Sequence, residues 1–97
     1  MNIDKKYKQK IISLITALQP KSKIYLFGSQ ATGTQTHGSD IDIAIDTGEK
    51  IKRSDVGEIR EVLNTTNIPY KIDIVDVNSV SENMKNIILN EGILWKN

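Results

Sequence analysis

The chain has 97 residues, and its 13 basic and 12 acidic residues leave a net charge of only +1. This balance argues against a general nucleic-acid-binding protein, and the absence of cysteine excludes disulfides and thiolate metal sites. No apolar run has the length of a signal or membrane segment, so we expect a cytoplasmic protein without membrane association. The length favours a single domain over residues 1–97.

The first half of the chain predicts one helix and two strands. Apolar residues recur at helical spacing over residues 4–18, which indicates an amphipathic helix. A short strand follows over residues 23–27 and is broken by Gly28, after which residues 29–33 favour a helical turn. A polar loop then leads into a second strand over residues 40–45.

The second half predicts two more helices with a strand between them. Ser54 is the expected cap of the first of these helices, and residues 71–77 alternate as a strand does. Ser79 and Glu82 form a capping box for the last helix, which Gly92 is placed to end. The order predicts an α+β fold, in which helices cover a small mixed sheet on one face.

Three aspartates are the candidate catalytic residues. Asp40 and Asp42 alternate with isoleucines, so they share the strand face opposite the core. Asp73, on the third strand, is expected on the same open face. Carboxylates gathered in this way suit two Mg²⁺ ions, although each aspartate alone is compatible with an ordinary solvated strand. Asp46 and Asp76 lie at strand ends, where a turn or cap role is favoured.

The turn at Gly28 and Ser29 is a candidate phosphate site. Glycine allows a ligand close to the backbone, and Ser29 offers a hydroxyl and an N–H at the start of a helical turn. A lone Gly-Ser pair is more often an ordinary turn, and no Walker-type lysine follows it. Together with the nearby aspartates, however, the turn indicates phosphoryl or nucleotidyl transfer.

A longer motif joins these features. It reads Gly-Ser-x-Ala-x-Gly over residues 28–33 and Gly-Ser-Asp-x-Asp over residues 38–42. This motif resembles the signature of the polymerase-beta-type nucleotidyltransferase superfamily, and the short chain resembles its minimal nucleotidyltransferase branch. The resemblance extends over most of residues 24–95 and implies a polymerase-beta-like nucleotidyltransferase fold.

The resemblance also implies roles for the matching residues. Gly28 and Ser29 would hold the β- and γ-phosphates of ATP, and Ser39 would contribute to nucleotide binding. Asp40 and Asp42 would bridge two Mg²⁺ ions. The third aspartate would join them at one ion and help to lower the pKa of an attacking hydroxyl.

The motif departs from many relatives within the turn. Gln30 and Thr32 stand where those relatives carry arginines, and the loss of a bidentate guanidinium weakens triphosphate binding. Lys52 and Arg53 are candidate replacements if their loop folds over the site. His37 is open to a role as base or nucleotide contact, but a lone loop histidine more often has neither.

The resemblance implies a partner as well. Minimal nucleotidyltransferases are commonly paired with a HEPN-family toxin, so the implied activity is transfer of AMP from ATP to a tyrosine hydroxyl of that toxin, as an antitoxin. One alternative is a non-catalytic antitoxin that acts by binding alone. Another is a nucleotidyltransferase for small molecules. The apolar end around Trp95 either packs onto the domain or docks a partner.

Overall fold

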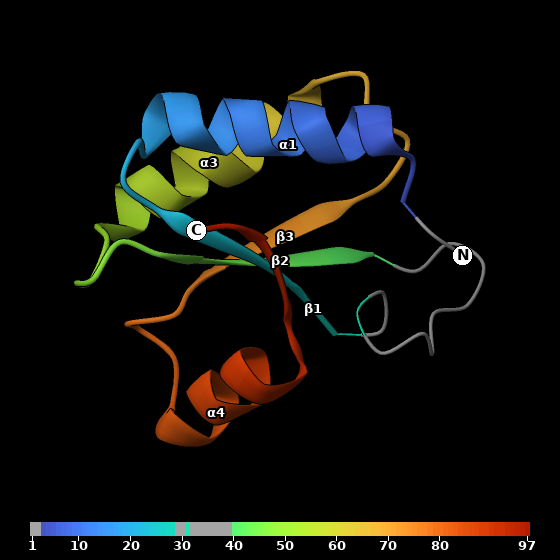
Figure 1. Cartoon of the computed structure of the whole chain (residues 1–97). Helices are drawn as coiled ribbons and strands as arrows, with labels where there is room; N and C mark the ends of the chain where they lie inside the picture. Colours follow the sequence, from blue (N-terminus) through green and yellow to red (C-terminus); the bar gives the residue numbers. More distant parts are fainter. Residues whose placement is uncertain (1–2, 29–30, 32–39) are drawn as a thin grey trace.

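The computed structural model describes residues 3–28, 31 and 40–97. The helices are α1 (Lys5–Leu18), α3 (Arg53–Thr65) and α4 (Glu82–Glu91), and the strands are β1 (Lys23–Phe27), β2 (Ile41–Asp46), β3 (Ile72–Asp76) and β4 (Ile93–Lys96) (Figure 1). The strands lie in the order β3-β2-β1-β4. Because β2 and β3 are parallel and the other pairs are antiparallel, the predicted mixed sheet and α+β class are confirmed.

Helix α1 forms where the apolar periodicity predicts it. Its N-cap is Asp4, whose carboxylate accepts a hydrogen bond of 3.0 Å from the backbone N–H of Lys6. This bond satisfies one of the N–H groups that the first turn leaves without a helical partner. Ile11 and Ile15, four residues apart, are fully buried and therefore lie on the same face of the helix, against the sheet.

Helix α3 begins slightly earlier than the sequence indicates. Its N-cap is Lys52, which makes no capping hydrogen bond through its side chain. Ser54 therefore lies inside the first turn, and its predicted capping role is wrong. Asp55 in the same turn has a favourable charge for the positive end of the helix dipole.

Helix α4 is capped by Ser81, whose hydroxyl accepts a hydrogen bond of 3.2 Å from the backbone N–H of Met84. The predicted capping box of Ser79 and Glu82 is therefore wrong. The Ser79 hydroxyl instead donates to Oδ2 of Asp76 over 2.7 Å. A buried carboxylate competes successfully for this donor because a charged acceptor forms the stronger hydrogen bond.

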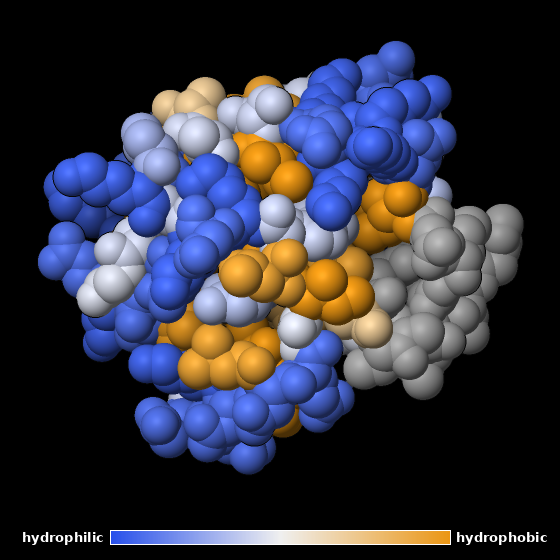
Figure 2. Space-filling model, in the orientation of Figure 1, coloured by the Kyte–Doolittle hydropathy of each residue, from blue (hydrophilic) through white to orange (hydrophobic). Residues whose placement is uncertain are grey.

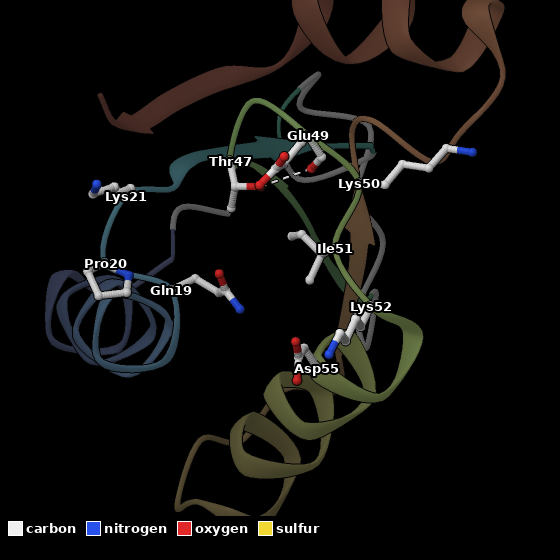
Figure 3. A pocket seen from close by; sticks show the side chains of 9 residues that line it. All are labelled: Gln19, Pro20, Lys21, Thr47, Glu49, Lys50, Ile51, Lys52 and Asp55. Atoms are coloured by element: carbon white, nitrogen blue, oxygen red, sulfur yellow. Dashed lines mark hydrogen bonds between the residues drawn. The ribbon is translucent and has the colours of Figure 1, made fainter.

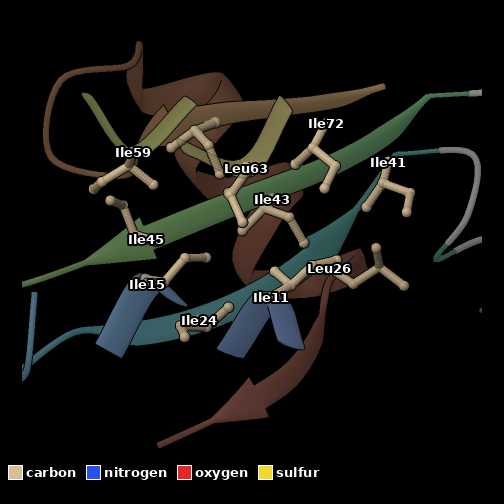
Figure 4. Close-up of a cluster of buried hydrophobic side chains, with 11 residues drawn as sticks. Ile11, Ile15, Ile24, Leu26, Ile41, Ile43, Ile45, Ile59, Leu63 and Ile72 are labelled. Carbon is tan, nitrogen blue, oxygen red and sulfur yellow. The ribbon is translucent and has the colours of Figure 1, made fainter. Parts of the chain in front are cut away.

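The main core lies between the sheet and the helices α1 and α3 (Figure 4). Most of its members are isoleucines, whose branched side chains suit a pleated strand surface. Each fully buried side chain of this size contributes roughly 1.5–3 kcal/mol to folding. The members are Ile11, Ile15, Ile24, Leu26, Ile41, Ile43, Ile45, Ile59, Leu63, Ile72 and Ile74.

A second, smaller core lies on the opposite face of the sheet, under α4. It consists of Ala44, Val77 and Ile88, all of them fully buried. The helices thus lie on both sides of the sheet, α1 and α3 on one and α4 on the other (Figure 1). The prediction that helices cover a single face is wrong for α4. On this face of β2, Ala44 lies between Asp42 and Asp46. Its small side chain leaves room for Ile88.

Strand β4 is a feature that the sequence did not predict. It pairs antiparallel with β1 and brings Trp95 against the main core, which confirms the packing interpretation for that residue. Ile93 and Leu94 remain 46% and 49% exposed. Apolar side chains gather near the middle of the face in Figure 2, where β4 lies. Within the described residues, no helix has both the length and the apolar character needed to cross a membrane.

Candidate active site

Asp42 and Asp73 are neighbours across the parallel strands β2 and β3. Their Cα atoms are register partners, and side chains in register on adjacent strands point to the same face of a sheet. That face is the one opposite the main core, because Ile41 and Ile43 flank Asp42 and are fully buried on the core side. The structure thus brings two of the three predicted carboxylates together.

Asp40 lies one residue before β2 and is exposed. The negative charge of Asp40 nevertheless affects the Asp42 carboxylate. Burial of the Asp42 carboxylate raises its pKa above the ordinary range, and the negative charges of Asp73 and then Asp40 raise that pKa further. Asp73 and Asp40 therefore both repel Asp42, and a cation bound between these carboxylates would relieve that repulsion.

The donor chemistry of this face fits Mg²⁺. Carboxylate oxygens are hard ligands, and Mg²⁺ typically uses one or two of them together with water and substrate phosphates. The arrangement of the side chains fits a metal ion less well than their chemistry does. Within the described part of the chain, no three acidic or imidazole side chains are grouped so that they could hold one metal ion. All three aspartates would share an ion only after a side-chain movement.

Gly28 ends β1 directly beside Asp42, in keeping with the register that pairs Phe27 with Asp42. Its φ of +76° lies in the left-handed region that other residues rarely adopt. A β-carbon placed on Gly28 would lie only 2.5 Å from Oδ2 of Asp42. Glycine therefore lets the turn and the carboxylate meet. Ser29 and Ser39 lie outside the described residues, so their nucleotide contacts stay predictions.

The candidate replacements for the missing arginines lie away from the acidic pair. Lys52 lines a cavity of about 400 Å³ between the end of α1 and the segment that follows β2 (Figure 3). From Asp42 to Asp46, where β2 ends on that side, is already roughly 13 Å of extended strand. Arg53 lines a second cavity, together with Asp76 at the carboxyl end of β3. Gln30, Thr32 and His37 are outside the described residues.

Arg60 of α3 is a site residue that sequence reasoning missed. Its Nε donates a hydrogen bond of 3.2 Å to Oδ1 of Asp73, and its Nη2 donates one of 2.8 Å to the carbonyl of Ile74. The available signal was weak: Arg60 follows the core residue Ile59, so a helix packed on the sheet places it near an edge. The partner across that edge is not evident from the sequence.

Asp46 and Asp76 serve the structure at the far end of the strands, as predicted. Oδ1 of Asp46 accepts hydrogen bonds from the N–H of Gly48 and from Nδ2 of Asn78, each 2.8 Å. Asp76 is only 5% exposed and accepts hydrogen bonds from three donors, the N–H groups of Ile51 and Asn78 and the hydroxyl of Ser79. These contacts fasten the loops after β2 and β3 to each other.

The structure has a small mixed sheet in which a glycine lies beside paired aspartates. This arrangement is the one expected of the nucleotidyltransferase domains that the motif predicts. The sequence of the chain confirms this class. It belongs to the polymerase beta nucleotidyltransferase family, whose model matches residues 9–96. The resemblance inferred from the residue 28–42 motif is thus confirmed at the level of the family.

Comparisons with individual proteins support the same family. Protein adenylyltransferase MntA of Shewanella oneidensis is 35% identical over 88 residues, which cover 89% of this chain and 63% of that relative. The chain thus spans less than two thirds of that relative's length. A chain of a toxin–antitoxin crystal structure with AMP-PNP has a TM-score of 0.80 and 32% identity, covering 91% of this chain and 71% of that one.

A second solved structure is the complex of the tri-AMPylated HEPN toxin of Shewanella oneidensis with its MNT antitoxin. Its matching chain has a TM-score of 0.77 and 26% identity, covering 96% of this chain and 71% of that one. The predicted fold and the predicted enzyme class, a nucleotidyltransferase, are in accord with these relatives.

Proposed function

We propose that the chain is a protein adenylyltransferase that transfers AMP from ATP to a tyrosine hydroxyl of a HEPN-family toxin and so acts as its antitoxin. The names of the relatives support this activity, because one is a protein adenylyltransferase and the solved neighbours are toxin–antitoxin assemblies. The structural observation that carries the proposal is the pairing of Asp42 and Asp73 beside Gly28. The proposed unit is a single cytoplasmic domain over residues 1–97.

In this proposal the turn after β1 binds the nucleotide. Gly28 and Ser29 would hold the β- and γ-phosphates, with Ser39 as a further contact. Backbone N–H groups of a glycine turn bind phosphate oxygens without any side chain. Because Gly28 lies against Asp42, a triphosphate held by this turn would lie next to the carboxylates.

The three aspartates, Asp40, Asp42 and Asp73, are the proposed ligands of two Mg²⁺ ions. Bound Mg²⁺ would neutralise the phosphate charge and favour the departure of pyrophosphate. The side chain of Asp73 is 50% exposed, so an incoming tyrosine can reach it. Asp73 is therefore suited to receive the hydroxyl proton as the new bond to the α-phosphorus forms.

The test uses ATP labelled at the α-phosphate, Mg²⁺, the purified chain and a purified HEPN-family toxin as the candidate partner. Label should pass to the HEPN protein, and Asp42→Asn should abolish the transfer. Asp46→Asn is the matched control, because Asp46 lies on the same strand and the same face, four residues further on. The control should keep most of the activity. Equal loss in both variants would contradict the proposed role of Asp42.

A second measurement on the same proteins distinguishes an antitoxin that acts by AMP transfer from one that acts by binding alone. If the Asp42→Asn variant neutralises the toxin as fully as the wild type does, AMP transfer is dispensable and the chain acts by contact alone. The measurement is the ribonuclease activity of the HEPN protein with each variant, with and without ATP. Neutralisation that requires both ATP and Asp42 supports the proposed activity.

A further inference from the structure

Strand β3 is an outer strand of the sheet, and two side chains of α3 bind its outward backbone groups. Asn64 donates from Nδ2 to the carbonyl of Ile72 over 2.8 Å and accepts from the N–H of Ile72 over 3.0 Å. One helical turn earlier, Arg60 donates from Nη2 to the carbonyl of Ile74 over 2.8 Å. Both residues therefore hold the strand that carries Asp73 against the helix.

Arg60 differs from Asn64 because it also contacts a carboxylate of the candidate site. Its Nε donates to Oδ1 of Asp73 over 3.2 Å, and the backbone N–H of Ile74 donates to the same oxygen over 3.0 Å. Two donors thus converge on Oδ1, and neither of them uses Oδ2. The guanidinium is planar and rigid, so its anchorage on the Ile74 carbonyl fixes the direction from which it holds Asp73.

We propose that Arg60 is the positioning residue of the third carboxylate: it holds Asp73 through Oδ1 and leaves Oδ2 to face a divalent cation. The inference rests on the proposed function, which makes Asp73 a metal ligand. Hydrogen bonds to ligating carboxylates orient them, and removal of such a partner typically costs about 10–100-fold in metal affinity or activity.

The geometry of the guanidinium matters more here than its charge. The side chain of Arg60 is 46% exposed, and exposed ion pairs contribute little by charge alone. A lysine ammonium is a compact point charge and does not reproduce a fork that spans the Asp73 carboxylate and the Ile74 carbonyl. Arg60→Lys therefore should not restore the function of the wild type, although it keeps the positive charge.

The test measures Mn²⁺ binding directly, by the electron paramagnetic resonance signal of the free ion, in the wild type and in three variants. Arg60→Gln keeps an amide donor for β3 but is too short for the same hold on Asp73, and its affinity for Mn²⁺ should fall about tenfold or more. Arg60→Lys should behave more like Arg60→Gln than like the wild type. Asn64→Ala, the matched control, should change the affinity less than twofold.

Thermal unfolding of every variant, followed by circular dichroism, separates site effects from loss of structure. Arg60→Gln and Asn64→Ala should both lower the melting temperature, because each weakens the attachment of β3 to α3. Only the arginine variants should weaken Mn²⁺ binding. Equal loss of affinity in Asn64→Ala, or Mn²⁺ binding in Arg60→Gln as tight as in the wild type or tighter, overturns the inference.

AMP transfer by the same proteins distinguishes this inference from the function on which it rests. Wild-type protein that binds Mn²⁺ but transfers no AMP contradicts the proposed function and leaves the comparison of arginine variants intact. Active wild-type protein whose Arg60→Gln variant keeps its Mn²⁺ affinity overturns the role of Arg60 alone. In an active enzyme, Arg60→Gln should lower kcat with little change in KM for ATP, because the phosphates are assigned to the Gly28 turn.

Discussion

Gly28 and Asp42 are so close that any side chain at position 28 would meet the carboxylate: a β-carbon there would lie 2.5 Å from Oδ2 and 3.3 Å from Cγ of Asp42. The end of β1 and the acidic strand β2 are thus in close contact at Gly28 and Asp42. Both the stability of the domain and its proposed chemistry depend on the absence of a β-carbon at that point.

Gly28→Ala should therefore destabilise the protein in two ways. The left-handed backbone costs about 1–2 kcal/mol for alanine, and the Asp42 carboxylate must rotate away from the new β-carbon, which adds about 1 kcal/mol. Gly48→Ala is the matched control, because Gly48 has a φ of +90° but nothing within 4 Å of a β-carbon. Urea unfolding of both variants measures the difference, and equal destabilisation would show that the contact with Asp42 carries no cost.

Asp42→Asn should stabilise the protein at neutral pH. Burial and the neighbouring negative charges raise the pKa of Asp42, so its ionised form is less favourable in the folded state than in the unfolded chain. This destabilisation exists above the raised pKa and disappears as the pH falls below the ordinary aspartate range. Melting temperatures across pH 4–8 should thus show a gain for the variant that shrinks in acid. A loss of stability at pH 7 would contradict the expected sign.

Asp46→Asn should have the opposite effect, four residues further along the same strand. Burial raises the pKa of Asp46, but hydrogen bonds from Gly48 and Asn78 outweigh it and, with Lys23 and Lys85, lower the pKa. A lowered pKa adds stability above the unfolded-state pKa, and that stability is lost as the pH falls through the folded-state pKa. The variant should be less stable than the wild type at pH 7 and approach it in acid. Parallel pH profiles for wild type and variant would refute this.

Asp76→Ala should destabilise the protein. Asp76 is buried and accepts hydrogen bonds from the N–H groups of Ile51 and Asn78 and from the hydroxyl of Ser79. The three hydrogen bonds are only partly buried, so each lost bond costs about 1 kcal/mol and a total loss of about 3 kcal/mol is expected. Ser79→Ala removes only one of the three bonds and should cost about 1 kcal/mol. Denaturant unfolding measures both, and similar losses would contradict this account.

The parts of the fold that local sequence determines could be predicted. Helix α1 has an N-cap at Asp4 and an apolar stripe, and β1 is bounded by Gly28, so both were predictable from adjacent residues. The side of the sheet that α4 covers was not predictable. It depends on the contact of Ile88 with Ala44, two residues far apart in the chain that meet only after the sheet has formed.

The candidate site also has a part that could be predicted from the sequence and a part that could not. Alternation along β2 was sufficient to place Asp42 on the open face, and the parallel register then brought Asp73 beside it. The contact of Arg60 with Asp73 was beyond sequence reasoning, because it passes around the edge of the sheet between two elements whose relative position only tertiary packing decides. Strand β4 was missed because four residues after a helix carry too little periodicity to identify a strand.

The bonds from α3 to the outer side of β3 also occupy backbone groups at that border of the sheet. A foreign strand that approaches β3 finds the amide and carbonyl of Ile72 and the carbonyl of Ile74 already engaged, so cross-chain β-sheet growth is discouraged there. The border that bears Asp73 is thereby protected from non-specific association. The side chain of Asp73 on the same border is nevertheless 50% exposed, so the proposed tyrosine acceptor could reach it there.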